Sequence, residues 1–527
     1  MKKLISIALS AAVLLGMFGC ARDNAVGVKD YGDGAPGELE IPPTSQNSTL
    51  PRFVLPSRPN FGTDVSVHDP SIFKDDDGTF YTFGSHFAVA RSTNLISWTQ
   101  YARDNQSHLL YGGTSHQNSP WRTVLAEAFT HCGLGTDGNP PGSTWAPDVI
   151  KLGNRYYMYY SLSTWGVNRS YIGRVEASSI TGPYSNSVEI IKTPNTGTNV
   201  PNAIDPALLR DKNGRLWMSY GSFFGGMYIL ELETSGPRIG LPIAGQGNFG
   251  TRIWRGAGSG GPEGPYIFYN PDTDYYYLMV TYGSLSTDYN MCIARSRNPD
   301  GPYLDIRGRN VVTTTTSIIG NKLAGNYRFE RASRGYAALG HNSVLVDNGK
   351  YYVIYHTRFQ SGASGVTGNH NQYVNQLFFT DSGWPVMAPN RYARESAGRV
   401  DPEDVLGEYD LLVHTPVGND ITFATSVLHS FYSDGSVRLG PYTGTTGIKE
   451  PTREIPDYIR PSSMAAENVG TWVRTGDYHF VVTINGAAYN GVMVPQYIND
   501  VGGNGYAALS FTGVSSQGNS MWANKRQ

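Results

Sequence analysis

The sequence predicts an all-β protein, in which a five-bladed β-propeller is followed by a smaller C-terminal β-barrel or sandwich. Two observations lead to this prediction. A short sequence motif recurs five times. Each copy has an acidic residue or a histidine at its head, which we call the anchor, followed by a turn and a strand rich in aromatic residues. From about residue 399 the pattern gives way to a run of shorter strands. Repeats of this length, all β in pattern, are typical of a propeller with one sheet per repeat.

The five anchors stand at the heads of the repeats. In chain order they are His68-Asp69-Pro70, Trp145-Ala146-Pro147-Asp148, Ile204-Asp205-Pro206, Glu263-Gly264-Pro265 and Gly340-His341-Asn342. The aromatic strands are predicted over residues 79–85, 155–161, 215–222, 275–284 and 350–357. An Asp-Gly or Asn-Gly step precedes three of them, at Gly78, Gly214 and Gly349. Such a step between two apolar runs is a strong hairpin signal.

Loops that recur at one end of every blade gather around a common axis. The sequence therefore predicts that five distant side chains meet there: Asp69, Asp148, Asp205, Glu263 and His341. Carboxylates placed together repel one another and shift each other's pKa, which costs stability. Such groups cluster where their chemistry is used, so the arrangement indicates a catalytic site.

The N-terminus has the pattern of an export signal. Lys2 and Lys3 precede an apolar run that is too short for a mature membrane span and that stops at Gly19-Cys20. A small residue before a cysteine is typical of a bacterial lipoprotein, so residues 1–20 are predicted to be a signal peptide, with Cys20 carrying a lipid that anchors the protein to a membrane. The alternative is an ordinary secretory signal. In both cases we expect an exported protein: an outer-membrane lipoprotein, periplasmic or at the cell surface, or a secreted protein.

The remaining organisation follows from composition. Residues 21–59 are rich in proline and are predicted to form a flexible tether. The propeller is assigned to residues 60–398 and the C-terminal β-domain to residues 399–527. The net charge of −2 argues against a nucleic-acid partner. We expect a monomer, and the sequence leaves open whether Cys132 and Cys292 form a disulfide or remain buried thiols.

The five anchors, in this order and spacing, resemble those of glycoside hydrolase family 43. Within it the chain is most similar to endo-α-1,5-L-arabinanases that carry an extra C-terminal β-domain, and the resemblance covers roughly residues 60–527. It implies an inverting hydrolase that cleaves internal α-1,5-L-arabinofuranosidic bonds of arabinan, the polysaccharide of pectin side chains. Inverting enzymes place an acid and a base on opposite sides of the scissile bond, with room for a water molecule.

The resemblance also implies a role for each site residue. Asp69 would be the general base and Glu263 the general acid, while Asp205 would tune the pKa of Glu263 and help to orient it. His341 would lie beside a calcium ion held largely through water. The remaining three candidates would form the substrate-binding set: Trp145 and Trp165 as apolar faces for arabinose rings, and Asp148 chiefly as a support for its loop.

One segment departs from the family pattern, and two other functions stay open. At residues 370–376, Tyr373 and Asn375 stand where the family usually has Arg and His, which affects the metal surroundings and the substrate preference. The first alternative is an exo-acting arabinofuranosidase or β-xylosidase, since the long insertion at residues 104–142 could wall off the cleft. The second is a non-catalytic glycan-binding surface lipoprotein, which would have lost one of the acids.

Overall fold

The computed structural model describes residues 50–104, 106–134, 144–194, 197, 199–256, 260–315, 318–415, 422–442, 467–499 and 505–527. The predicted signal peptide, Cys20 and most of the predicted tether lie outside these residues. Within the described part of the chain, no helix has the length and apolar character needed to cross a membrane.

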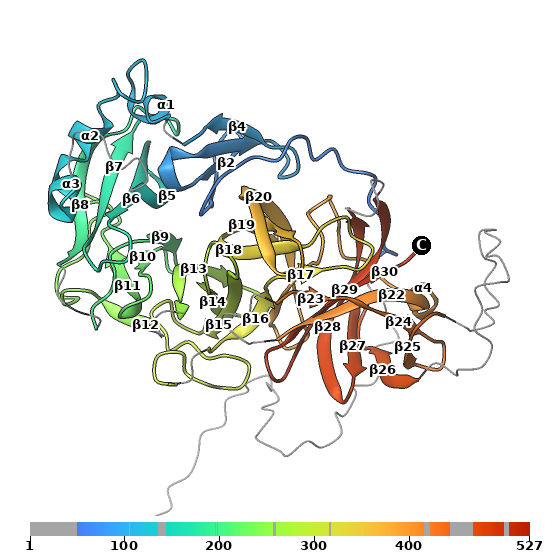
Figure 1. Ribbon diagram of the computed structural model, residues 1–527. Coiled ribbons are helices and arrows are strands. Elements are labelled where there is room, and N and C mark those ends of the chain that lie inside the picture. The colour runs from blue at the N-terminus through green and yellow to red at the C-terminus, as the bar shows by residue number, and fades with distance from the viewer. Residues whose placement is uncertain are drawn as a thin grey trace, which may run out of the picture. The chain divides into compact units, whose positions relative to one another are not determined.

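Five antiparallel sheets form the propeller, as the sequence predicts, and each blade uses a continuous stretch of chain (Figure 1). The first sheet is β1 (Ser71–Lys74), β2 (Phe80–Phe83), β3 (Val89–Ser92) and β4 (Thr99–Ala102). The second is β5 (Thr144–Leu152), β6 (Arg155–Ser163), β7 (Ser170–Ala177) and β8 (Ser185–Thr193). The third is β9 (Ala207–Arg210), β10 (Leu216–Tyr220), β11 (Gly226–Leu232) and β12 (Thr251–Arg255).

The last two blades continue this order. The fourth is β13 (Glu263–Asn270), β14 (Tyr275–Tyr282), β15 (Asn290–Ser296) and β16 (Asn321–Ala324). The fifth is β18 (Tyr336–Asp347), β19 (Lys350–Ser361), β20 (Gly365–Phe379) and β21 (Pro385–Met387). Two short strands, β17 (Tyr327–Arg328) and β23 (Ala424–Thr425), extend the fifth sheet, so a segment from the C-terminal domain joins a blade.

Local turn chemistry explains why the hairpins form where the sequence predicts. Between β9 and β10, the Asp211 carboxylate accepts hydrogen bonds from the backbone N–H groups of Asn213 and Arg215, at 2.9 Å each. Gly214 supplies the left-handed conformation at φ 81° that the turn requires. The neighbouring aromatic strand then buries its side chains between blades.

The insertion at residues 104–142 contains short helices that the sequence analysis did not predict. In its described part these are α1 (His108–Tyr111), α2 (Trp121–Val124) and α3 (Ala126–Cys132). They pack an apolar surface against the second blade, with Trp121 and Phe129 fully buried. A 3-10 turn, η1 (Ser85–Phe87), follows β2, and a one-turn helix, α4 (Pro402–Val405), precedes the second domain.

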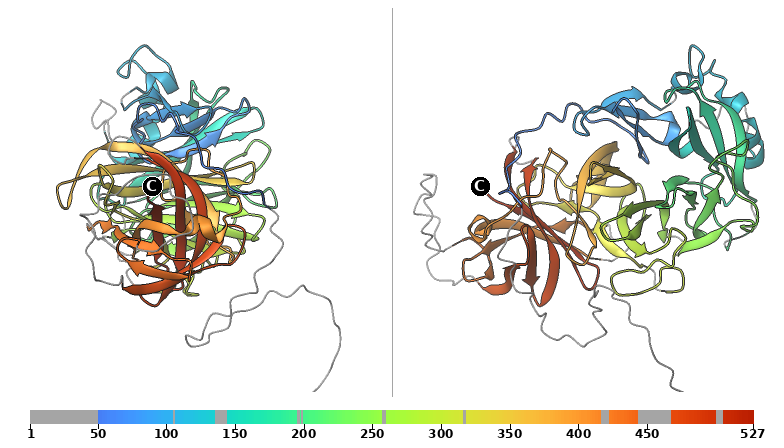
Figure 2. Two further views of the ribbon diagram at one scale, coloured as in Figure 1. Left: turned by 90° about the vertical axis from the view of Figure 1, so that its right-hand side faces the viewer. Right: turned by 180° about the vertical axis from the view of Figure 1, so that it is seen from behind.

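The C-terminal domain is a closed barrel of eight strands, which resolves the open choice between barrel and sandwich (Figure 2). The strands are β22 (Gly407–His414), β24 (Val427–Phe431), β25 (Ser436–Leu439), β26 (Asn468–Arg474), β27 (His479–Ile484), β28 (Ala487–Ile498), β29 (Tyr506–Ser515) and β30 (Ser520–Lys525). Pairing of β22 with β30 closes the ring, and Phe431, Phe480 and Phe511 fill its interior.

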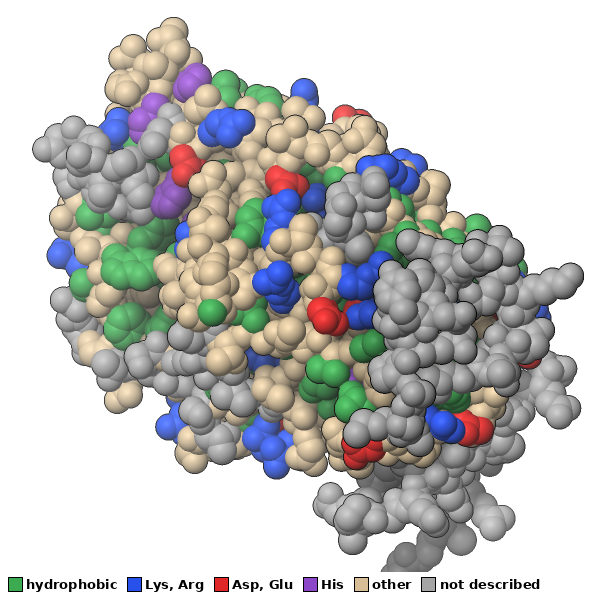
Figure 3. Space-filling model, turned by 45° about the vertical axis from the view of Figure 1, so that its right-hand side comes forward, with side chains coloured by type: hydrophobic (Ala, Val, Ile, Leu, Met, Phe, Trp, Pro, Cys, Tyr) green, Lys and Arg blue, Asp and Glu red, His purple; other side chains and the backbone are tan. Residues whose placement is uncertain are grey.

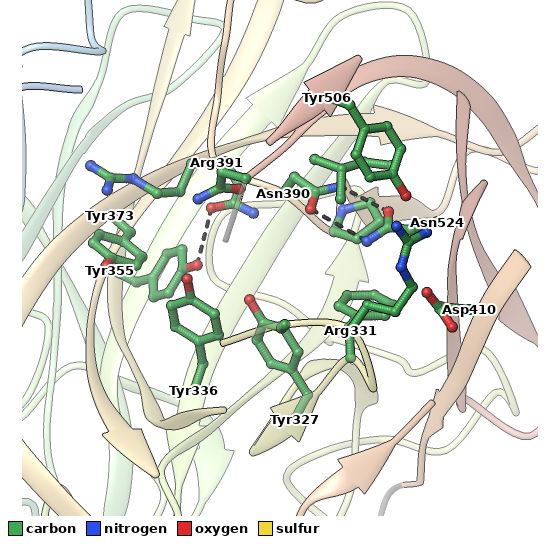
Figure 4. Close-up of a pocket in the computed structure, with 16 residues that line it drawn as sticks. Tyr327, Arg331, Tyr336, Tyr355, Tyr373, Asn390, Arg391, Asp410, Tyr506 and Asn524 are labelled. Carbon is green, nitrogen blue, oxygen red and sulfur yellow. Dashed lines mark hydrogen bonds between the residues drawn. The ribbon is translucent and has the colours of Figure 1, made fainter. Parts of the chain in front are cut away.

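A small cavity lies where the fifth blade meets the barrel, and Figure 4 shows tyrosines from the blade facing polar side chains from both parts. The Asn390 amide donates to Gln496 at 3.0 Å and to Asn524 at 2.9 Å. The charged groups at this junction have partners: Arg391 pairs with Asp64 at 3.0 Å, and Asp410 pairs with Arg526. These satisfied contacts indicate a structural junction.

Cys132 and Cys292 are both free and buried, so the disulfide alternative is wrong. Each thiol lies within the core of a different blade region, on α3 and β15. On the face shown in Figure 3, Lys and Arg side chains are interspersed with Asp and Glu among uncharged groups, in keeping with the net charge of −2.

Candidate active site

The five anchors converge at the start of the innermost strand of each blade. A pocket on the axis is lined by residues of all five anchors, among them Asp69, Asp148, Asp205, Gly264 and His341. Convergence follows from the topology: Asp69 and Asp205 stand just before β1 and β9, and the other three anchors lie within β5, β13 and β18, the first long strands of their blades. The structure therefore brings together the side chains that the sequence analysis placed on the axis.

Asp69 is held in a dense polar environment. Its carboxylate accepts a hydrogen bond from Ser85 Oγ at 2.5 Å and lies 3.1 Å from His341 Nδ1 and 3.2 Å from His68 Nε2. Burial alone would raise the pKa of Asp69, but His341, His68 and the Ser85 hydroxyl outweigh burial and lower the pKa below its ordinary value. Asp69 is therefore an ionised carboxylate near neutral pH.

The backbone at Asp69 is left-handed, with φ 55°, which Asp tolerates better than most residues. Its N–H donates to His356 Nδ1 at 3.1 Å, and this contact reaches into the fifth blade. The Ser85 hydroxyl also accepts from the N–H of Ala146 at 2.9 Å, which links the first and second blades. Asp69 thus depends on contacts from three blades.

Glu263 has the opposite electrostatic character. Ser222 Oγ donates to one carboxyl oxygen at 3.0 Å, and the Tyr289 hydroxyl donates to the other. Burial raises the pKa of Glu263 to about 8, and the negative charge of Asp69 adds to the increase. Glu263 is therefore a protonated carboxylic acid near neutral pH.

Asp205 resembles Glu263 in having a raised pKa. Burial is the largest cause that raises its pKa; with Glu263 and Asp69 raising the pKa and His341 lowering it, the pKa of Asp205 is about 8. One Asp205 oxygen accepts from the N–H of Gly264 at 3.2 Å, so it contacts the loop that carries Glu263. Like Asp69, Asp205 has a left-handed backbone, at φ 59°.

His341 packs against the Glu263 loop. A Cβ at Gly264 would lie 3.1 Å from the His341 ring, and Gly264 has φ 59°, so a side chain there would crowd the ring and strain the backbone. The N–H of His341 donates to Thr281 Oγ1 at 2.8 Å, which fixes its backbone. These contacts hold the His341 ring beside Asp69, with Nδ1 3.1 Å from its carboxylate.

The three residues predicted to bind substrate occupy different settings. Asp148 is buried, accepts from Ser71 Oγ and takes a 2.6 Å bond from the N–H of Leu208, so it ties three blades together as a support. Trp145 is half-buried. Trp165 is 75% exposed and meets Trp145 edge to face, with ring centroids 6.1 Å apart. An exposed tryptophan beside a second one forms a surface on which a sugar ring can stack.

Three histidines in the described residues have ligand atoms close enough together to bind one metal ion: His68, His356 and His370, within 4.8 Å of one another. Burial lowers the pKa of all three, to about 3 for His68, so the rings are neutral and able to bind a metal. Calcium prefers oxygen ligands, so this nitrogen-only cluster does not fit it. His341 is outside the cluster.

The axial pocket fits calcium better than the histidine cluster does. Asn342 Oδ1 is a buried oxygen without a hydrogen-bond partner in the described structure, Asp69 Oδ1 lies only against imidazole nitrogens, and both residues line the pocket beside His341. Oxygen donors with room for water are the surroundings that calcium prefers.

The site contains the two groups that proton transfer to and from a substrate requires. An ionised Asp69 can accept a proton from water, and a protonated Glu263 can donate one to a leaving group. Two carboxyl groups whose pKa values are displaced in opposite directions have the protonation states that a general base and a general acid need.

The buried acids also predict a dependence of stability on pH. Asp205 and Glu263 keep their protons up to about pH 8 in the folded protein, whereas unfolded carboxyls ionise near ~4. Buried histidines with lowered pKa values act in the opposite sense, but above about pH 6.5 they are neutral in both states. Between about pH 6.5 and 8 the folded state therefore binds more protons, and stability falls as pH rises.

We expect Tm to fall across this window in calorimetry, and to fall less in Asp205→Asn. A rising Tm that the variant leaves unchanged would contradict the assignment.

Sequence reasoning missed the residues that support the acids. These are Ser85, Ser222, Tyr289 and His356; His68 stands out in the sequence only as part of an anchor, and His370 only as the first residue of the segment 370–376. His356 carried the strongest available signal, as a lone histidine at the end of the apolar run 351–355. Ser222 and Tyr289 carried none, because serine and tyrosine are common throughout the strands.

Two family models match the chain. The model described as glycosyl hydrolases family 43 matches residues 63–385, and the model of its C-terminal lipocalin-like domain matches residues 389–523. These two ranges correspond to the propeller and to the barrel.

Known proteins match over nearly the whole length. Extracellular endo-α-(1→5)-L-arabinanase 2 of Bacillus subtilis is 36% identical over 509 residues, covering 90% of this chain and 96% of that protein. A Thermotoga petrophila protein named extracellular endo-α-(1→5)-L-arabinanase is 36% identical over 495 residues, covering 86% and 93%. The crystal structure of an endo-1,5-α-L-arabinanase from Thermotoga petrophila RKU-1 in complex with TRIS has a TM-score of 0.75 at 34% identity, covering 89% of this chain and 100% of that one.

Proposed function

Since the chain belongs to glycosyl hydrolase family 43, we propose that it is an inverting endo-arabinanase that cleaves internal α-1,5-L-arabinofuranosidic bonds of arabinan. The observation that carries the reaction is the opposite displacement of two pKa values: that of Asp69 is lowered and that of Glu263 is raised to about 8. The names of the relatives support arabinan as the substrate.

In this proposal Asp69 removes a proton from a water molecule, which attacks the anomeric carbon from the face opposite the leaving group. Glu263 gives its proton to the departing glycosidic oxygen, so the bond breaks with inversion of configuration. The Ser85 hydroxyl and the histidines keep Asp69 ionised until it takes the proton. Tyr289 and Ser222 hold the Glu263 carboxyl in place.

Asp205 acts through its neighbours in this proposal. Its contact with the Gly264 N–H fixes the loop that carries the acid, and because Glu263 raises the pKa of Asp205, the two neighbouring carboxyls disfavour each other's ionisation. His341, with the oxygens of Asp69 and Asn342, would hold a calcium ion largely through water. Bound there, the ion would supply positive charge on the axis.

The first test is a product profile over time on linear α-1,5-arabinan, with native arabinan and a xylan alongside. A ladder of arabino-oligosaccharides with an early fall in viscosity is expected. Release of one small sugar from the outset would show an exo-acting enzyme instead. No cleavage of any polymer, with retained binding, would show a glycan-binding protein.

Trp165→Ala should weaken substrate binding without changing the chemistry. Because the exposed ring lies outside the pocket of acids, we expect KM for arabinan to rise about tenfold while kcat changes little, the loss of one stacking contact. Initial rates on linear arabinan check this. Trp98→Phe, in the core of the first blade, is a control for loss of a tryptophan. A fall in kcat with unchanged KM would contradict the stacking role.

Removal of calcium should reduce both activity and thermal stability. Without a cation, the buried oxygens beside His341 lose their compensating charge. We expect a chelator to lower Tm and turnover, and added calcium to restore both, more fully than magnesium, which demands a rigid octahedral site. Unchanged Tm and rate after complete removal of metal, verified by elemental analysis, would contradict the calcium site.

We further propose the domain boundaries 60–398 and 399–527, export through residues 1–20, and lipid attachment at Cys20. The ranges matched by the two family models support the boundary, and the word "extracellular" in the names of both relatives supports export. Mass spectrometry of the mature protein from its native host tests the lipid.

A further inference from the structure

A polar cleft of about 370 Å³ lies on the first blade, away from the acids. It is lined by Ser57, Arg58, Pro59, Asn60, Asn94, Ile96, Ser97, Ala393 and Arg394, and we call it the blade-1 cleft. Asp69 precedes β1, whereas residues 93–98 join β3 to β4. Because these strands are antiparallel neighbours, the residue 93–98 loop lies at the end of the blade opposite Asp69.

The free hydrogen-bonding capacity of this cleft consists of donors. Arg58 and Arg394 are exposed, and no acidic side chain of the described residues forms an ion pair with either. Asn94 Oδ1 already accepts from the N–H groups of Ile96 and Ser97, at 2.9 Å each. Asn60 Oδ1 accepts from the N–H of Gly62 at 3.1 Å, which leaves both side-chain NH₂ groups available. With no carboxylate in its lining, the cleft favours an anion.

The walls of the cleft are fixed by their own contacts. The Asn94 bonds hold its loop, and Ser97 Oγ donates to the carbonyl of Asn60, which ties the segment before β1 to the blade. Arg394 has φ 68°, a conformation rare for arginine. The N–H of Ala393 donates to the buried Glu395 carboxylate at 2.6 Å and holds this segment. A preformed site loses little entropy when a ligand binds.

We propose that the blade-1 cleft binds a glycan that contains uronic acid. Arginine forms paired hydrogen bonds with planar carboxylates. Amide groups of Asn60 and Asn94 can serve sugar hydroxyls, and Pro59 and Ile96 offer apolar surface to ring carbons. The volume lies within the range of about 300–1,000 Å³ typical of organic-ligand pockets, larger than a simple inorganic ion needs. Such a site would hold an acidic stretch of a polysaccharide while the distant acids act on a neutral stretch.

The test is binding of tri-galacturonate, measured by calorimetry at low salt, to the wild type and to Arg58→Gln/Arg394→Gln. We expect saturable binding to the wild type that weakens as salt is added. In the double variant we expect the affinity to fall by about tenfold or more. Arg255→Gln/Arg307→Gln removes two exposed arginines elsewhere and should bind like the wild type. Arabinotriose should not compete at this cleft. Turnover of neutral arabinan should be equal in all three proteins, so the outcome is independent of the proposed reaction.

Four results would overturn the proposal. They are no saturable binding of tri-galacturonate, equal affinity in the cleft variant, equal loss in the control variant, or full competition by inorganic phosphate at the same concentration. Binding to phosphatidylglycerol vesicles without binding to tri-galacturonate would assign the cleft to a membrane surface instead. Circular dichroism and Tm of each variant confirm that the comparison is between folded proteins.

Discussion

Glu263→Gln should lower kcat on linear arabinan about a thousandfold, within the range of about 10²–10⁴ that general acid–base catalysis contributes. Glutamine keeps the size of the side chain and its contacts with Ser222 and Tyr289, but it has no proton to give to the leaving oxygen. Affinity for arabino-oligosaccharides should stay within a few-fold of the wild type. Steady-state rates and calorimetric binding check both statements.

A substrate with a good leaving group separates the acid from other roles. An aryl arabinoside needs little protonation, so Glu263→Gln should retain much more of its activity on such a compound than on arabinan. Glu233→Gln removes a glutamate that follows β11 in the third blade and has no described side-chain hydrogen bond, and this variant should behave like the wild type. Near-normal turnover of arabinan by Glu263→Gln would remove Glu263 from the role of acid.

Asp69→Asn should be equally damaging, with a loss of about a thousandfold or more on every substrate, including aryl arabinosides. Unlike Glu263→Gln, this variant cannot activate water, so a good leaving group gives no rescue. Asparagine tolerates the left-handed conformation at φ 55°, which separates loss of the base from loss of the backbone. Rates on the two substrate types distinguish base from acid.

The stereochemistry of rescue provides an independent check. If Asp69 is a base, azide should not restore activity through a product of retained configuration, and wild-type product followed by NMR should show inversion at the anomeric carbon. Asp434→Asn, on an exposed turn of the barrel, is a control for loss of an aspartate. A retained product from the wild type would make one of the carboxylates a nucleophile and overturn the inverting mechanism.

The fold was largely predictable because its signals are local. The strand predicted at residues 155–161 is β6 (Arg155–Ser163), and the one at 275–284 is β14 (Tyr275–Tyr282). In each case a turn residue fixes the start and buried aromatic residues fix the face. The helices of the insertion escaped prediction because four to seven residues carry too little periodicity, and Trp121 and Phe129 gain their helical setting from the blade they cover.

The candidate site was predictable only to the level of its anchors. Asp69, Asp205 and Glu263 follow from a repeat, since equivalent loops must meet on the axis. The residues that contact these acids do not occur at the same position in every blade. Tyr289 directly precedes the third strand of its blade, and His356 lies in the second strand of its own. Protonation states depend on such contacts, and a linear sequence does not contain the distances. Asp148 is the opposite case: it occupies a repeated anchor position, but its hydrogen bonds with Ser71 and Leu208 serve to hold neighbouring blades together.

The contacts of Asp69 with His341 and His356 have a consequence for heat tolerance. Asp69 belongs to the first blade and both histidines to the fifth, so these contacts cross the point at which the ring of blades closes. Side-chain bonds secure this closure, such as Lys74 to Asp347 at 2.6 Å and Ser343 Oγ to the Pro70 carbonyl at 2.7 Å. We expect warming that loosens the closure to separate Asp69 from His341, which helps to keep it ionised, while every individual sheet stays intact. The upper working temperature is then set by the joint between two blades rather than by the melting of either.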